Sequence, residues 1–175
     1  VDTALQHAKE NGVRLMVFPE CALTGYPSRD ITSPEEVDFE KMEEVYEKLQ
    51  NFANQNDIYV LVGTITKSGE KYYNTAMCFR PNQQVFLYRK RALWGWDQDN
   101  FDRGNEDDVL EIDGFKVGVR ICFEVRFPEF FRELYDKETD FNVILFYDVA
   151  DIDDVERYDL IKAHIRTRAV ENVTY

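Results

Sequence analysis

The hydrophobic positions of this chain fall into short continuous runs that are separated by longer amphipathic stretches. Continuous apolar runs of this length are typical of strands that are buried on both faces of a sheet. Three such runs occupy residues 13–18, 115–121 and 141–147. The amphipathic stretches carry apolar residues at helical spacing, and they occupy residues 1–10, 33–54 and 155–172, with a fourth that begins at Pro128. This alternation of strands and helices predicts an α/β fold with covered sheets.

In the middle of the chain the pattern changes to strands that are joined by tight turns. Residues 58–65 and 71–79 are apolar runs on either side of Lys67–Glu70, whose Ser-Gly pair predicts a hairpin turn. A third strand is expected at residues 85–88, after another turn. No internal repeat, low-complexity tract or linker interrupts the pattern. We therefore expect a single domain over residues 1–175.

The composition and net charge of the chain restrict the kinds of molecule that it is expected to bind. The 175 residues are 44% hydrophobic, which is enough for a core, and their formal net charge is −13. This charge argues against binding to nucleic acid or to an anionic membrane surface. Three cysteines without metal-ligand spacing, and no apparent signal peptide, favour a reducing, cytoplasmic location. With two histidines and no long apolar window, we expect no metal, no cofactor and no membrane span.

A cysteine marks the end of one buried strand. Cys122 directly follows the apolar run 115–121, and Pro128 is well suited to the first turn of the helix that follows. Open α/β sheets place their reactive groups at such strand ends, and a nearby helix amino terminus can favour a thiolate. The alternative is that Cys122 is a small apolar residue of the strand, which is the commoner role of a free cysteine.

Two charged residues follow other predicted strands. Glu20 comes directly after the run 13–18 and Pro19, so its carboxylate is either solvent-facing or held for chemistry in a poorly solvated place. Lys90 lies in the basic triplet Arg89–Arg91 after the third strand of the meander. Such a triplet is more often a solvated surface patch than a site.

Two aromatic residues and a histidine also have two interpretations. Trp94 and Trp96 occupy a charged loop, and because two exposed tryptophans are costly, we expect them to line a pocket or an interface. His164 lies on the apolar side of the predicted helix 155–172, where a packed histidine is more common than a catalytic base.

Together, Glu20, Lys90 and Cys122 and their surroundings resemble the carbon–nitrogen hydrolase (nitrilase) superfamily. The resemblance covers essentially the whole chain in the right order. It rests on the segments Phe18–Glu20, Tyr88–Leu93 and Gly118–Glu129, and on the supporting segments Leu23–Pro27, Tyr73–Ala76, Phe101–Gly104 and Arg168–Asn172.

The resemblance implies a four-layer α-β-β-α sandwich that usually forms a homodimer through one helical face. The family domain is longer than this chain, by a first strand before Val1 and a set of strands after Tyr175. It therefore implies that residues 1–175 are a fragment, incomplete at both termini. We expect a small-molecule substrate and a homodimer or higher homo-oligomer.

The resemblance also implies roles for the three residues. Cys122 would be the nucleophile that forms a thioester acyl-enzyme, and Glu20 would be the general base and acid. Lys90 would stabilise the tetrahedral oxyanion together with the backbone N–H of Phe123, and its charge would favour the thiolate.

Two positions depart from the family pattern. Many relatives have a second glutamate shortly after the lysine, whereas this chain has Asp97, with Asp99 close by. Either aspartate could take that role. Glu124 stands where an aspartate is common, two residues after the cysteine. Our candidates for the substrate pocket are Trp94, Trp96, Glu124, Tyr147 and Asp148.

The substrate class stays open at this point. We favour an amidase acting on small linear amides, because most of the superfamily cleaves amides, over a nitrilase or an N-carbamoyl hydrolase. The alternative from another class is a catalytically silent binding protein. Only the aspartate at position 97, in place of the usual glutamate, supports this alternative.

Overall fold

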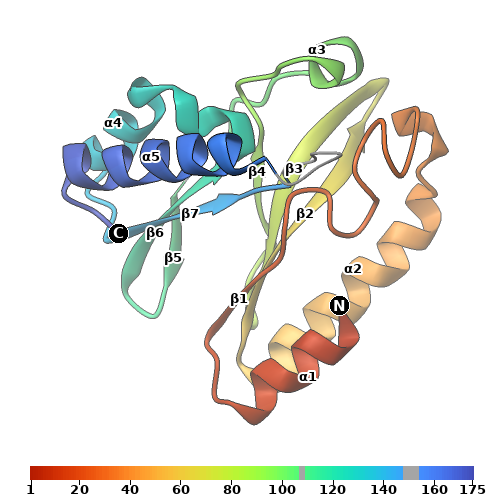
Figure 1. The fold of residues 1–175 in the computed structure, drawn as a ribbon. Coiled ribbons are helices and arrows are strands. Elements are labelled where there is room, and N and C mark those ends of the chain that lie inside the picture. Colours follow the sequence, from red (N-terminus) through yellow and green to blue (C-terminus); the bar gives the residue numbers. More distant parts are fainter. Residues whose placement is uncertain (107–108, 148–153) are drawn as a thin grey trace.

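Two β-sheets lie face to face in the computed structural model, which describes residues 1–106, 109–147 and 154–175 (Figure 1). The first sheet has the strand order β1-β2-β3-β4, in which β1 is parallel to β2 and the other neighbours are antiparallel. Its strands are β1 (Leu15–Val17), β2 (Tyr59–Ser68), β3 (Lys71–Phe79) and β4 (Phe86–Arg89). The predicted meander is therefore present, and the short parallel strand β1 joins it at one edge.

The second sheet contains the strand that leads to Cys122. Its order is β5-β6-β7, with β5 antiparallel and β7 parallel to the central strand β6. The strands are β5 (Val109–Ile112), β6 (Phe115–Ile121) and β7 (Phe141–Leu145). A one-turn 3₁₀ helix, η2 (Cys122–Arg126), follows β6 directly.

Helices cover the outer faces of both sheets. Figure 1 shows α1 and α2 on one side of the molecule and α4 and α5 on the other. Their bounds are α1 (Asp2–Glu10), α2 (Phe39–Asn56), α4 (Pro128–Asp136) and α5 (Val155–Asn172); the short elements are η1 (Pro34–Glu36) and α3 (Trp96–Asn100). The fold is thus the expected α/β fold, a four-layer α-β-β-α sandwich. None of the helices in the described ranges is long and apolar enough to cross a membrane.

The cores follow these layers. Apolar side chains from the facing sides of the two sheets form one cluster, made of Tyr59, Leu61, Ala76, Cys78, Tyr88, Leu110, Ile112, Val117, Val119, Ile121 and Leu145. A second cluster joins α1 and α2 to the outer face of the first sheet through residues such as Leu5, Leu49 and Phe79. Each fully buried side chain of this size contributes about 1.5–3 kcal/mol. The inter-sheet cluster therefore fixes one sheet against the other next to the site.

Helix α5 departs from the predicted pattern. Its buried residues are the polar Arg168 and Asn172, whereas Leu160 and Ile165 are exposed. The apolar side on which the sequence places His164 is therefore not a buried face, and His164 itself is only partly buried. The sequence pattern misleads here because a buried arginine can be satisfied by main-chain oxygens: Arg168 donates to the carbonyl of Val125.

Candidate active site

Three strand ends bring the candidate residues to one edge of the two sheets. Strands β1 and β4 run in the same direction, because β2 is parallel to β1 and two antiparallel pairings separate β2 from β4. Glu20 lies shortly after β1, Lys90 directly after β4, and Cys122 directly after β6 in the facing sheet. Their side chains meet there, because both the Lys90 ammonium and the Cys122 thiol are within hydrogen-bonding reach of the Glu20 carboxylate.

Lys90 is buried between two carboxylates. Its Nζ atom donates to Glu20 Oε1 at 2.8 Å and to Asp97 Oδ2 at 2.6 Å. Burial alone would lower the pKa of Lys90, but the charges of Glu20 and Asp97 outweigh it and raise the pKa well above its usual value. The lysine therefore stays cationic although only 2% of its side chain is exposed.

The Glu20 carboxylate is fixed by donors from both sheets. Oε1 also accepts the side-chain N–H of Asn74, on β3, at 2.8 Å, and Oε2 accepts the backbone N–H of Tyr147, after β7, at 3.2 Å. Both oxygens are thus engaged, and the residue is only 1% exposed. A carboxylate held in this way has one orientation relative to the thiol.

Cys122 occupies a strained backbone position at the end of β6. Its φ of 43° lies in the left-handed region, which is unfavourable for a residue with a side chain. Burial and the neighbouring Glu20, which is within hydrogen-bonding reach of the sulfur, raise the pKa of the thiol, while Lys90 lowers it. The thiol is therefore protonated at neutral pH, next to a carboxylate that can accept a proton.

Two glycines let other backbone segments approach the strand ends. A side chain at Gly63, on β2, would place its Cβ atom 2.6 Å from Glu20 Cα, and the Gly63 N–H donates to Pro19 O at 3.1 Å. A Cβ atom at Gly104 would lie 2.7 Å from the carbonyl carbon of Arg89, and the Gly104 N–H donates to Lys90 O at 3.1 Å. Both contacts fix the backbone from which an ionic side chain projects.

A hollow of about 270 Å³ opens in front of Cys122 and Lys90. Aromatic side chains are the largest group in its wall, and Tyr26 stacks on Tyr147 with 4.5 Å between ring centroids. The wall contains Tyr26, Trp94, Phe123, Phe146 and Tyr147, and two arginines, Arg126 and Arg157, complete the charged part of the lining. The hollow is large enough for a small molecule only.

The structure separates our pocket candidates. Trp94 and Tyr147 line the hollow, whereas Trp96 and Glu124 do not. Trp96 packs edge-on against Phe101 with 5.4 Å between ring centroids, in a hydrophobic cluster. Glu124 is buried away from the hollow, against main-chain donors. The fifth candidate, Asp148, lies outside the described residues.

The two candidate aspartates are also separated. Asp97 is buried and contacts Lys90, whereas Asp99 is exposed on another side of α3 and lines a different surface hollow. Sequence reasoning missed Asn74 and Arg126 as residues of the site. Both lie inside the segments that carry the family resemblance, Tyr73–Ala76 and Gly118–Glu129, which was the available signal.

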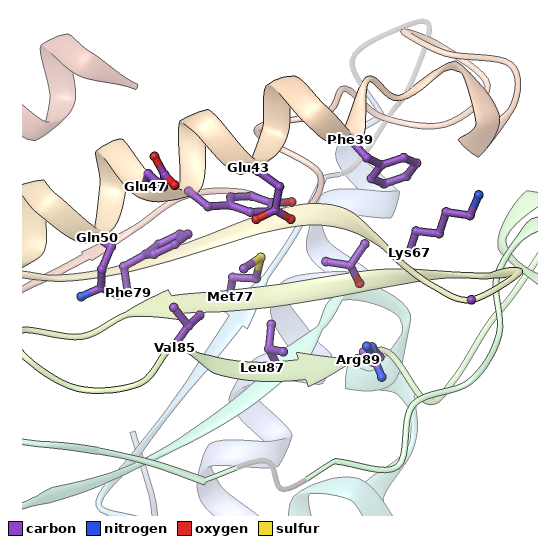
Figure 2. Close-up of a pocket in the computed structure, with 13 residues that line it drawn as sticks. Phe39, Glu43, Glu47, Gln50, Lys67, Met77, Phe79, Val85, Leu87 and Arg89 are labelled. Atoms are coloured by element: carbon purple, nitrogen blue, oxygen red, sulfur yellow. The ribbon is translucent and has the colours of Figure 1, made fainter.

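A larger hollow lies on the outer face of the first sheet (Figure 2). It has a volume of about 620 Å³ and runs between α2 and strands β3 and β4. Its floor is apolar, and Figure 2 shows Met77, Phe79, Val85 and Leu87 below the carboxylates of α2. None of Glu20, Lys90 and Cys122 lines it. Lys90 and Cys122 line the smaller hollow instead. Within the described ranges, no group of three or more His, Cys, Asp or Glu side chains could hold a metal ion.

Comparison with known proteins gives relatives of several activities. A nitrilase from Pyrococcus abyssi is 32% identical over 149 residues, which are 78% of this chain and 53% of that protein. A 2-oxoglutaramate amidase from Bacillus subtilis is 26% identical over 162 residues, which are 90% of this chain and 60% of that protein. The chain thus spans about half the length of the curated relatives that it matches.

Solved structures share the fold. An amidase from Nesterenkonia sp. AN1 is 23% identical and superposes with a TM-score of 0.84 over 99% of this chain and 67% of that one. A carbon–nitrogen hydrolase from Helicobacter pylori G27 gives a TM-score of 0.85 at 18% identity, over 98% of this chain and 64% of that one. The family model described as carbon–nitrogen hydrolase matches residues 1–175. This chain belongs to the carbon–nitrogen hydrolase family.

Proposed function

We propose that this chain carries the catalytic residues of a cysteine hydrolase that cleaves the carbon–nitrogen bond of small linear amides. The observation that carries the proposal is the position of the Cys122 thiol within hydrogen-bonding reach of the Glu20 carboxylate, which is ion-paired to the buried Lys90. Amidases among the relatives support it, since the Nesterenkonia enzyme is described in complex with butyramide and with acrylamide added at its active-site cysteine.

The first half of the reaction forms an acyl-enzyme. Cys122 Sγ attacks the amide carbonyl carbon while its proton passes to Glu20, so the sulfur attacks as a thiolate. The carbonyl oxygen becomes an oxyanion, which the Lys90 ammonium and the backbone N–H of Phe123 stabilise. The tetrahedral adduct then collapses, the C–N bond breaks, and Glu20 returns the proton to the departing amine or ammonia. A thioester on Cys122 remains.

The second half consumes water. Glu20 removes a proton from a water molecule that attacks the thioester carbonyl, and Lys90 stabilises the second oxyanion in the same way. Collapse of this adduct expels the Cys122 sulfur, which recovers its proton from Glu20, and releases a carboxylic acid. Asp97 holds the Lys90 ammonium through a second ion pair throughout.

Within this class we propose substrates that carry a carboxylate at some distance from the amide. Arg126 lines the hollow in a protein of net charge −13, and its guanidinium can attract an anionic group. The guanidinium of Arg126 lies over the Phe123 ring at 5.2 Å from the centroid, which orients it. Relatives described as a 2-oxoglutaramate amidase and an omega-amidase agree with this choice.

The test is to trap the acyl-enzyme and read its mass. The protein is incubated with short neutral amides, monoamides of dicarboxylic acids, N-carbamoyl amino acids and nitriles, then quenched and analysed as intact protein, with Cys122→Ala as control. We expect a mass increase with amides that is absent in the variant, largest with the monoamides of dicarboxylic acids. Adducts with nitriles or carbamoyl compounds alone would change the substrate class. A folded protein that gives no adduct and no ammonia would favour the silent binding protein.

A further inference from the structure

A second glutamate is buried close to the catalytic cysteine without facing the hollow. Glu124 lies in the 3₁₀ turn η2, two residues after Cys122, and none of its surface is exposed to solvent. It does not line the hollow in front of Cys122, and its two oxygens face main-chain N–H groups instead of the Cys122 thiol, so it is not placed to touch a substrate. A buried carboxylate without such a role is costly unless its oxygens are satisfied.

The oxygens of Glu124 accept hydrogen bonds from donors next to the catalytic residues. Oε2 accepts the backbone N–H of Ile121, which precedes Cys122, at 2.7 Å. Oε1 accepts the backbone N–H of Arg91, which follows Lys90, at 2.7 Å, and the hydroxyl of Tyr88 at 2.8 Å. Among the described residues, the hydrogen-bond donors to this carboxylate are thus main-chain N–H groups and one hydroxyl.

These donors belong to different sheets. Tyr88 lies in β4 of the first sheet and Arg91 two residues after that strand, whereas Ile121 is the last residue of β6, in the second sheet. One carboxylate therefore joins the turn that carries Lys90 to the turn that carries Cys122. We propose that Glu124 is a positioning residue that sets the separation between the Lys90 ammonium and the Cys122 sulfur. This role rests on the proposed hydrolase function.

The chemistry of a glutamine at this position shows why the carboxylate matters. Gln has the same shape, but one of its two ends is an NH₂ group, which donates. Turned toward Ile121, this group meets a backbone N–H; turned the other way, it meets the donors of Arg91 and Tyr88. In either orientation two donors face each other, so one turn has to shift. A shift of about 1 Å in a catalytic constellation can cost about 10²-fold in rate.

A merely structural role would predict a different result. If Glu124 only satisfies buried N–H groups, its replacement lowers stability and leaves the folded fraction with normal chemistry. If it sets the separation of Lys90 and Cys122, the folded variant has an altered thiol, because Lys90 lowers the pKa of Cys122. The pH dependence of the reactivity of the Cys122 thiol therefore distinguishes the two roles. It can be measured without any substrate turnover.

The experiment compares Glu124→Gln and Tyr88→Phe with the wild type. The matched control is Asp140→Asn, which alters a carboxylate that accepts the backbone N–H of Lys116 at the opposite end of β6. For each protein we measure the thermal midpoint, kcat and KM for the best amide, and the pH profile of Cys122 alkylation by iodoacetamide.

We expect Glu124→Gln to lower kcat by about 10–100-fold with KM within about 3-fold, and to move the alkylation profile to higher pH. Tyr88→Phe leaves the main-chain hydrogen bonds to Glu124 in place and should lower kcat by about 3–10-fold. Asp140→Asn should change neither quantity. A folded Glu124→Gln protein with wild-type kcat and alkylation profile would overturn the proposal. If this variant does not fold, wild-type values for Tyr88→Phe overturn it instead.

The design separates this inference from the function on which it rests. If the wild type hydrolyses no amide, the proposed function fails, and the alkylation profiles still report whether Glu124 sets the environment of the thiol. If the wild type is active and the profiles coincide, only the positioning role fails.

Discussion

Glu20 and Glu124 are both hidden from solvent at the same edge of the two sheets, but their neighbours differ. Glu20 receives one hydrogen bond from the Lys90 ammonium and lies within reach of the Cys122 thiol. Within the described residues, Glu124 receives its hydrogen bonds from main-chain N–H groups and the Tyr88 hydroxyl. The first carboxylate thus faces a group that can exchange a proton, while the second faces groups that keep theirs at any ordinary pH.

This difference shows that burial alone does not mark a catalytic carboxylate. A buried glutamate next to an ionisable sulfur and an open hollow can accept and return protons. A buried glutamate whose oxygens bind backbone N–H groups is instead suited to hold two segments together. The neighbours of each carboxylate therefore decide its role, and substitutions around Glu20 and Glu124 can test the distinction.

The largest effect is expected for Glu20→Gln. Removing the proposed general base should lower kcat/KM by about 10²–10⁴-fold. At the same time the thiol should react faster with iodoacetamide at a given pH, because Glu20 raises the pKa of Cys122 and its charge is then absent. Steady-state kinetics and alkylation rates check both parts. Slower alkylation together with lost turnover would contradict our account of the thiol.

A smaller effect is expected for Asp97→Asn. Asp97 and Glu20 raise the pKa of Lys90, so removal of one carboxylate lowers that pKa, and the ammonium is lost at a lower pH. We expect kcat/KM to fall by about 10-fold, the cost of one charge-assisted hydrogen bond, and the alkaline limb of its pH profile to move to lower pH.

The matched control for this prediction is Asp99→Asn, which alters an exposed carboxylate on the same short helix. It should leave the pH profile of kcat/KM unchanged. Equal shifts in both variants would mean that the general charge of α3, and not the contact with Lys90, governs the profile.

The smallest effect is expected for Asn74→Leu. The substitution removes one neutral donor from Glu20 Oε1, which keeps its bond to Lys90. The loss of a single hydrogen bond of about 0.5–1.5 kcal/mol should lower kcat/KM by about 2–10-fold. A loss as large as that of Glu20→Gln would show that Asn74 is needed to orient the carboxylate. Kinetics of the two variants measured side by side decide this.

Most of the fold could be predicted from the sequence because its strands are short apolar runs and its helices are amphipathic. The meander, strand β6 and helix α5 lie within a few residues of the expected ranges. The family resemblance also brought Glu20, Lys90 and Cys122 forward, and the structure places them together. The homodimer, the further strands outside residues 1–175 and the cytoplasmic location stay predictions.

The rest could not be predicted because residues two positions apart diverge in a helix. A separation of two residues turns a helix by about 200°, so such neighbours face nearly opposite ways. The family pattern placed Asp97 at the position of the second glutamate but left either aspartate able to take that role, and in the structure Asp97 contacts Lys90. Where the short helix α3 begins decides this, and no sequence pattern predicted α3. Trp94 and Trp96 separate in a similar way, one at the hollow and the other in a hydrophobic cluster.

The close approach of Gly63 and Gly104 to the strand ends has a consequence for mutational scans of this protein. Any side chain at Gly63 would displace the backbone of Glu20, and any side chain at Gly104 would displace the backbone before Lys90. Both positions should therefore be as intolerant of substitution as the ionic residues themselves, although neither takes part in the chemistry. A mutational scan that records only the loss of activity would therefore class Gly63 and Gly104 with the catalytic residues. Adding a small molecule that replaces a lost side chain would not restore the activity of these variants.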